Sequence, residues 1–144
     1  CVLLTSVVFA QEDENAKVKA TIDTFFEGFH KGDTILMKSV MMDKFTTQTA
    51  FTNKEGRDVL VTEDSSILIK AITNRPKDQK WDERLSDFNI QVDGNMANVW
   101  TNYEFWFNNN FSHCGVNSFQ LFYDNGRWKI IYLIDTRRIK GCQK

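Results

Sequence analysis

The residues of this chain that could carry chemistry are few and scattered. His113 is the best single candidate for acid–base work, because it lies near the end of an expected strand and an unperturbed imidazole titrates at about pH 6.5. The alternative is a histidine that ends a turn and bonds to the backbone. Tyr103 and Tyr132 could orient a carbonyl group or stabilise an enolate, although such tyrosines are more often core rings with the hydroxyl at the rim.

Other charged residues have simpler interpretations. Asp135 and Arg137 are two apart on one strand, so a guanidinium could position a carboxylate. Strand alternation places both on the outer face, which favours a structural salt bridge near a dimer seam. His30 ends an expected helix, where a cation is favourable, and is expected to do no chemistry. The Asp-Glu and Lys-Asp-Gln-Lys runs are expected to be solvated loop charges.

No complete catalytic pattern can be assembled from the sequence. It holds no Ser-His-Asp set, Gly-rich phosphate loop or paired inward carboxylates. The two histidines are isolated and no Cys-X-X-Cys occurs, so neither a metal site nor a cofactor is expected. Whether the protein is an enzyme therefore stays open at this stage.

Length and charge limit the classes of partner. The 144 residues are 42% hydrophobic, which is enough for one core, and we expect a single domain over residues 11–144. A net charge of −1 gives no electrostatic case for nucleic acid or anionic membrane as a partner.

Residues 1–10 have the pattern of the back half of a secretory signal peptide. They are apolar, carry small residues before an expected cleavage after Ala10, and precede an acidic stretch. The mature protein is then expected to be secreted or periplasmic, without membrane contact. A short N-terminal strand and a lipid-anchored Cys1 are the alternatives.

Removal of that segment leaves two cysteines, Cys114 and Cys142, in an oxidising compartment. The hairpin register places Cys114 opposite Arg137, so the tail must fold back before the sulfurs can meet, and Gly141 would permit the bend. A structural disulfide is expected, with two free thiols as the alternative.

Hydrophobic periodicity predicts three helices before the main sheet. The first covers residues 14–31, the second follows a cap at Asp33 and covers residues 34–42, and the third begins after Thr62. Their expected buried faces are Val18, Ile22, Phe25, Phe26 and Phe29; Ile35, Leu36, Val40 and Met41; and Ile67, Leu68, Ala71 and Ile72. Short strands are expected over residues 45–52 and 58–61.

Four long β-type runs follow, over residues 81–92, 97–107, 114–123 and 128–137, with a hairpin turn at Asn125-Gly126. The order α-α-β-β-α-β-β-β-β indicates an α+β fold with all helices on one face of a strongly curved, mainly antiparallel sheet. Alternation from that turn predicts an inward set of His113, Asn117, Phe119, Leu121, Tyr123, Trp128, Ile130, Tyr132, Ile134 and Thr136. In the preceding strand the odd residues from Ala97 to Phe107 are expected inward.

Several of these segments resemble the nuclear transport factor 2-like superfamily. The likeness is carried by the Phe-rich first helix ending in residues 30–33, the turn and strand at 93–99, and residues 113–121 and 125–138. The C-terminal half is most similar to exported bacterial members of the SnoaL-like and lumazine-binding type. The resemblance implies a cone in which a curved sheet wraps three helices, over residues 14–140.

The superfamily cone also implies a pocket and a homodimer. The expected pocket residues are Phe25, Phe29, Tyr103, Phe105, Phe107, His113, Asn117, Tyr132 and Thr136. An apolar outer patch is expected to form the dimer interface: Trp100, Trp106, Phe122, Ile131 and Leu133. The leading hypothesis is an exported domain that binds a small apolar or aromatic ligand. The alternatives are a cofactor-free enzyme of the SnoaL or ketosteroid-isomerase type (isomerase, cyclase or dehydratase) and a dimerisation scaffold with a filled cavity.

Overall fold

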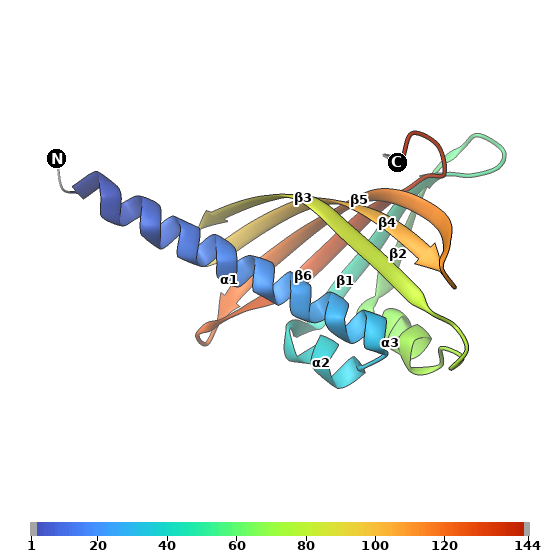
Figure 1. Cartoon of the computed structure of the whole chain (residues 1–144), viewed down its shortest axis with the longest axis horizontal. Coiled ribbons are helices and arrows are strands. Elements are labelled where there is room, and N and C mark those ends of the chain that lie inside the picture. Colours follow the sequence, from blue (N-terminus) through green and yellow to red (C-terminus); the bar gives the residue numbers. More distant parts are fainter. Residues whose placement is uncertain (1–2, 143–144) are drawn as a thin grey trace.

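A computed structural model of the chain describes residues 3–142 (Figure 1). Its elements are α1 (Leu3–Lys31), α2 (Thr34–Ser39), β1 (Met41–Thr52), β2 (Asp58–Asp64), α3 (Ser65–Thr73), β3 (Trp81–Asp93), β4 (Met96–Phe107), β5 (Asn110–Asp124) and β6 (Arg127–Arg137). The expected element order is confirmed. Residues 3–10 are helical, so the alternative of an N-terminal strand is wrong there. Residues 1 and 2 lie outside the described part, and the signal peptide stays a prediction.

The strands form a single sheet in the order β2-β1-β6-β5-β4-β3. All neighbours are antiparallel except β1 and β6, which run parallel. Figure 1 shows α1 lying across the concave side of the curved sheet, with α2 and α3 near one end of α1. Over residues 3–142, no helix combines the length and the apolar character that crossing a bilayer requires.

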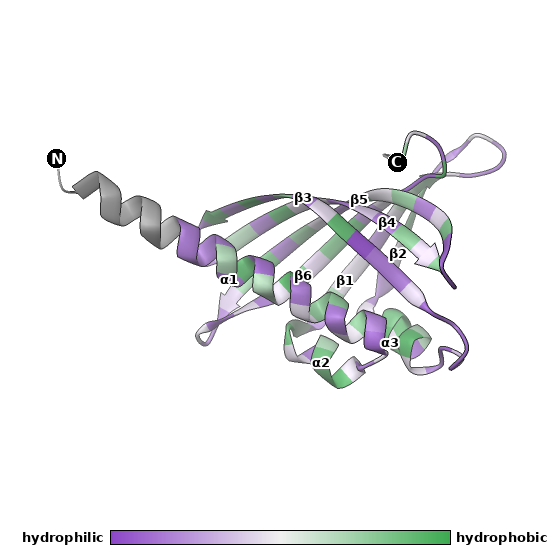
Figure 2. Ribbon diagram, in the orientation of Figure 1, coloured by the Kyte–Doolittle hydropathy of each residue, from purple (hydrophilic) through white to green (hydrophobic). Residues whose placement is uncertain are grey.

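The core lies between α1 and the middle of the sheet. The predicted face of α1 is buried, from Val18 to Phe29, as its spacing along the helix requires. Phe25 meets Phe45 and Phe119 edge to face, with ring centroids 6.2 and 6.3 Å apart. Burying one such side chain contributes about 1.5–3 kcal/mol. Figure 2 shows the corresponding alternation of apolar and polar residues along α1.

The helix α2 starts where expected but ends early. Asp33 is its cap: one carboxylate oxygen accepts the backbone N–H groups of Ile35 and Leu36 at 3.0 and 2.9 Å. The helix ends at Ser39, because the chain enters β1 at Met41. The predicted inward position of Ile35 is wrong, since 82% of this residue is exposed; Met37 is the buried side chain of this helix.

The helix α3 begins later than the sequence suggests. Asp64, not Thr62, is its cap, and its carboxylate accepts the N–H of Ser66 at 2.8 Å. Thr62 and Glu63 are instead part of β2, where they pair with Gln48 and Thr47 of β1. The longer β2 strand brings Glu63 to the end of the sheet that carries α3.

One extra residue in β6 reverses the facing of the end of that strand. Leu121 pairs with Ile130 but Gln120 pairs with Tyr132, so Ile131 forms a bulge. Up to Ile130 the predicted alternation is correct, and Trp128 and Ile130 are buried. Beyond the bulge it is inverted, and the predictions that Tyr132, Ile134 and Thr136 face inward are wrong. The inward residues there are Leu133, Asp135 and Arg137.

A disulfide joins Cys114 to Cys142, with 5.8 Å between the two Cα atoms. The same bulge shifts the neighbouring register, so Cys114 pairs with Arg138 rather than with Arg137. Gly141 has a φ of 67°, a conformation that suits glycine, and there the tail bends back toward β5. The expected pairing is therefore present, and it ties the tail that follows β6 to β5.

Candidate functional site

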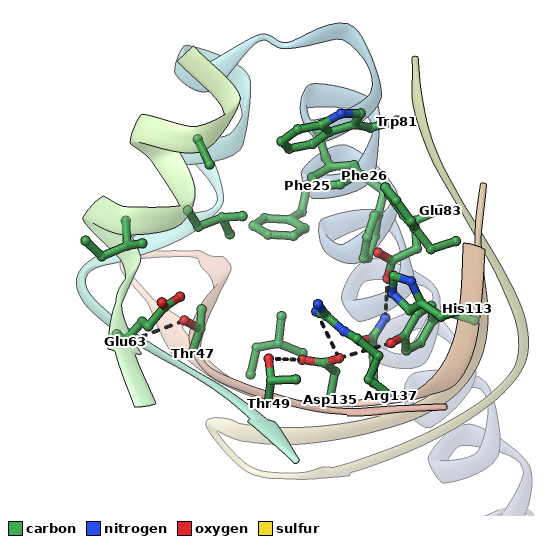
Figure 3. Close-up of a pocket in the computed structure, with 18 of the residues that line it drawn as sticks. Phe25, Phe26, Thr47, Thr49, Glu63, Trp81, Glu83, His113, Asp135 and Arg137 are labelled. Carbon is green, nitrogen blue, oxygen red and sulfur yellow. Dashed lines mark hydrogen bonds and ion pairs between the residues drawn. The ribbon is translucent and has the colours of Figure 1, made fainter. Parts of the chain in front are cut away.

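A cavity of about 440 Å³ opens between α1, α3 and the concave side of the sheet (Figure 3). Its wall is mostly apolar and aromatic, from Phe25, Phe26, Phe29, Ile67, Leu68, Ala71, Trp81, Phe105, Phe107 and Leu133. Its polar lining is Thr47, Thr49, Glu63, Glu83, Tyr103, His113, Asn117, Asp135 and Arg137. Seven of the nine predicted pocket residues are in these two sets.

The two predicted pocket residues that do not line the cavity lie beyond the bulge in β6. The Tyr132 hydroxyl donates to the side-chain oxygen of Gln48. The Thr136 hydroxyl accepts the backbone N–H of Val116 at 3.0 Å. Both are therefore engaged on the side of the sheet away from the cavity, as the inverted alternation requires.

The helix α3 gives the cavity one of its apolar sides. The predicted buried face of this helix holds for Ile72, which packs into the core. Ile67, Leu68 and Ala71 line the cavity instead, and 46% of Ile67 is exposed. An apolar helix face that lines an open space, rather than filling it, is typical of a ligand pocket.

Glu83 of β3 is a partly buried carboxyl that lines the cavity, and the sequence predicts its position in a strand but no role for it in the site. Its Oε1 accepts a hydrogen bond of 2.7 Å from Asn117 Nδ2. Burial raises the pKa of Glu83 to about 7, and nearby Asp135 adds to this effect, while Asn117 and Arg137 oppose it. Strand periodicity could have found it, because Trp81, Glu83 and Leu85 share one face of β3.

His30 fixes the backbone of Glu83 from the end of α1. Its Nε2 lies 3.0 Å from the backbone nitrogen of Glu83 and 2.9 Å from the carbonyl oxygen. Burial lowers the pKa of His30, which disfavours a positive charge on this ring. Lys31 is a cation in the last turn of α1, and Arg75 adds a second one, since it donates to the carbonyls of Phe29 and His30, each at 3.0 Å.

Asp135 is the second inward carboxylate, and its oxygens are already engaged. Thr49 donates to it at 2.6 Å, the Tyr103 hydroxyl lies 3.0 Å away, and Arg137 Nη2 lies 3.5 Å away (Figure 3). The Tyr103 hydroxyl also lies 2.8 Å from the carbonyl oxygen of Thr136, and burial raises the pKa of this phenol. The expected Asp135–Arg137 ion pair is present, but in the cavity and not on the outer face.

His113 lines the cavity as predicted, but not as an acid–base group of ordinary pKa. Its ring lies 5.0 Å from that of Phe105 and 5.8 Å from that of Tyr103, and its Nδ1 is 3.0 Å from the Ser112 hydroxyl oxygen. Burial, helped by the charge of Arg137, lowers the pKa of His113 to about 4. The ring is therefore neutral at physiological pH, and Glu83 is the better-placed proton carrier.

The outer face of the sheet is apolar only in part. Trp100 is 51% exposed and Ile131 is 36% exposed. Trp106 is partly covered by its own chain, since the Arg84 guanidinium lies 4.3 Å from its ring centroid. The prediction that Leu133 belongs to this face is wrong, because the bulge turns it toward the cavity.

The chemistry that this cavity offers is hydrogen bonding and proton transfer. The described residues contain no group of three His, Cys, Asp or Glu side chains that could hold a metal ion. Glu83 and Asp135 are inward carboxylates, so the expectation that none could be paired is wrong. They differ in environment, because donors surround Asp135 while Glu83 has one polar partner.

The sequence profile of the family described as "Putative lumazine-binding" matches residues 13–132. The chain has no sequence match among curated proteins. Its fold is similar to that of many solved structures, including an NTF2-like protein of unknown function from Shewanella baltica, at a TM-score of 0.61 and 15% identity over 88% of this chain and 94% of that one.

Two further structures with this fold carry more specific descriptions. One is a putative dehydratase of the NTF2-like family from Streptomyces avermitilis, with a TM-score of 0.68 and 11% identity over 89% of this chain and 98% of the other. The second is the beta subunit of a putative aromatic-ring-hydroxylating dioxygenase from Novosphingobium aromaticivorans, with a TM-score of 0.70 and 8% identity over 92% and 94% of the two chains. At these identities the likeness is one of fold alone.

Proposed function

Because the chain belongs to the "Putative lumazine-binding" family of the NTF2-like superfamily, we propose that it binds a small aromatic or apolar molecule in the cavity. The observation that carries this proposal is the cavity itself, with a volume of about 440 Å³ and a polar group of residues at one end of an aromatic wall. Volumes of roughly 300–1,000 Å³ with this mixture of linings are typical of small-molecule sites.

The aromatic wall suits a flat ligand. The rings of Phe29 and Trp81 lie 6.0 Å apart, and those of Phe29 and Phe105 lie 6.4 Å apart, at inclined angles. Such rings offer both faces and edges to a bound ring system. The polar end, with Glu83 and Tyr103, would then fix the orientation of the ligand, as the few polar groups of apolar pockets usually do.

A cofactor-free isomerase or dehydratase is the second candidate, and Glu83 is the observation that favours it. A carboxyl whose pKa is raised to about 7 can both take and give a proton near neutral pH. The solved NTF2-like structure described as a putative dehydratase makes this reaction class a reasonable one to assay. Turnover of an enolisable or hydroxylated aromatic substrate that disappears in Glu83→Gln would support it, and turnover unaffected by this change would contradict it.

Thermal shift with lumazine and a panel of bicyclic aromatic compounds tests the binding proposal. A ligand that binds only the folded protein at 100 times its Kd adds about 2.7 kcal/mol of stability, which raises the melting temperature measurably. Ala71→Phe should abolish the shift, because the new ring fills the cavity from α3. Lys70→Phe, which introduces the same side chain at an exposed neighbour that does not line this cavity, should leave the thermal shift intact. No shift in the unmodified protein for any compound at millimolar concentration would contradict the proposal.

We also propose that the protein is exported and forms a homodimer through the outer face of its sheet. The Cys114–Cys142 disulfide supports export, since such bonds persist in oxidising compartments. The exposed Trp100 supports an interface on this face. Sedimentation of the protein and of Trp100→Glu tests the dimer; a monomer at micromolar concentration in both would contradict it.

A further inference from the structure

We propose that the cavity selects ligands whose buried end presents an N–H donor and carries no negative charge, with Glu83 as the acceptor of that donor. This inference rests on the proposed function, because it concerns the same cavity. It names the chemical class of the ligand, which neither the fold nor the family description gives.

The hydrogen bonds of Glu83 leave one acceptor free toward the cavity. Asn117 donates to Oε1 at 2.7 Å, and no described residue donates to Oε2. Over the described residues, no fully buried side-chain nitrogen or oxygen lacks a partner, so Oε2 is accessible, and the side chain that carries it lines the cavity. A carboxylate oxygen only accepts hydrogen bonds, so the ligand must supply the donor.

Asp135 does not compete for this role. Thr49, Tyr103 and Arg137 already surround its two oxygens at 2.6, 3.0 and 3.5 Å. Asp135 therefore positions the surrounding side chains. Glu83 is the carboxylate of the site that can accept a hydrogen bond from a ligand.

The charges that line the cavity exclude an anion. Three carboxylates, Glu63, Glu83 and Asp135, face a single cation, Arg137, and that cation lies beside Asp135. His113 adds no positive charge, because burial lowers its pKa to about 4. Once Glu83 is ionised, a ligand carboxylate would therefore meet net negative charge at close range, whereas a donor or a cation would be attracted.

The apolar wall is compatible with two versions of this ligand. Aromatic faces such as those of Trp81 and Phe29 attract a protonated amine through cation–π contact, and they also stack on a neutral ring that carries an N–H group. The two versions share the donor that Glu83 requires and differ in charge, so experiment can separate them.

Binding of such a ligand must be linked to a proton. The ionisable groups around Glu83 come from every element packed on it: His30 from α1, Tyr103 from β4, His113 from β5, and Asp135 and Arg137 from β6, while Asp82 and Arg84 pair with each other on β3. The pKa of Glu83, about 7 in the free protein, falls when a donor stabilises its carboxylate. Binding therefore releases a proton near neutral pH, and affinity rises as the pH increases from 5 to 8.

Two matched probe pairs test the inference by isothermal titration calorimetry. Naphthylmethylamine and naphthylacetate share a ring system and differ in charge; lumazine and its di-N-methyl analogue differ in the two ring N–H donors. We expect the amine and the unmethylated lumazine each to bind at least tenfold more tightly than its partner. Titrations at pH 7 in phosphate and in Tris should show release of roughly half a proton, as expected for a group that is half protonated there. Discrimination in only one pair still supports the inference and identifies which version of the donor is used.

Glu83→Gln tests the acceptor directly. Asn117 would hold the amide oxygen of the new side chain, which leaves its NH₂ group pointing at the ligand donor. The preference for the amine over the acetate, and for lumazine over its di-N-methyl analogue, should therefore each fall below threefold. Glu104→Gln, which removes a carboxylate from the partner strand outside the cavity, should keep both. Preference for the acetate, equal binding within both pairs, or proton uptake would overturn the inference while leaving ligand binding intact. Failure of all four probes to bind the unmodified protein would instead contradict the proposed function, and this inference with it.

Discussion

Replacing Glu83 with glutamine should make the protein more stable than the unmodified one, by an amount that grows as the pH rises. The carboxyl has an ordinary pKa of 4.5 when the chain is unfolded and about 7 in the folded protein. The folded state therefore holds this proton more tightly than the unfolded state does, and the resulting stability is complete below pH 4.5 and is lost as the pH rises through 7. Each tenfold change in acidity corresponds to about 1.36 kcal/mol, so the loss by pH 8 is at most about 3 kcal/mol.

The glutamine variant has no such proton, and its amide oxygen can still accept from Asn117. Urea unfolding of both proteins at pH 4.5, 6, 7 and 8, followed by tryptophan fluorescence, should show a difference that grows in favour of the variant by up to about 3 kcal/mol. Glu104→Gln is the control for the removal of a carboxylate as such. A difference that is constant with pH, or that shrinks toward pH 8, would refute the reasoning on the burial of Glu83.

Three further predictions concern the surroundings of the cavity. Replacing both Cys114 and Cys142 with alanine should lower the free energy of unfolding by about 3.5 kcal/mol, the loop-closure value for a separation of 28 residues, and urea unfolding without reductant would measure it. The ring protons of His113 should not titrate in NMR spectra between pH 5 and 8, because burial and Arg137 lower its pKa to about 4; a midpoint above pH 6 would contradict this. Tyr103→Phe should cost about 1–3 kcal/mol, since it removes the hydroxyl that Asp135 and the Thr136 carbonyl share, and an unchanged urea midpoint would contradict that role.

Much of the fold could be predicted because its signals are local and repeated. The spacing of Val18, Ile22 and Phe25 identifies the buried face of α1, and the alternation in β4 places Tyr103 and Phe105 on the cavity side. These patterns involve several residues each, so no single exception changes the answer. The apolar part of the cavity could be inferred for the same reason.

The polar part of the cavity could be predicted only in part. The sequence predicts Tyr103, His113 and Asn117 there. It does not predict the carboxylates Glu83 and Asp135, for two physical reasons. The run from Ile130 to Ile134 is apolar at every position, so its composition gives no sign of the bulge at Ile131 that turns Asp135 inward. Glu83 is a charged residue in a charged stretch, so its residue type argues for exposure although its strand face argues for the cavity. Its hydrogen-bond partner Asn117 lies 34 residues away in the sequence. Such long-range pairing leaves no trace in the local pattern.

The bulge at Ile131 also means that the polarity of the cavity depends on how β6 pairs with β5 and not only on residue identity. If Ile131 paired with Gln120 without a bulge, Tyr132 and Thr136 would face the cavity, and Asp135 and Arg137 would face away from it. An ion pair would then give way to two neutral hydroxyls without any substitution. Proteins with this same architecture could thus change their ligands by gaining or losing one bulge in the last strand, while the core packed on Trp128 and Ile130 stays as it is.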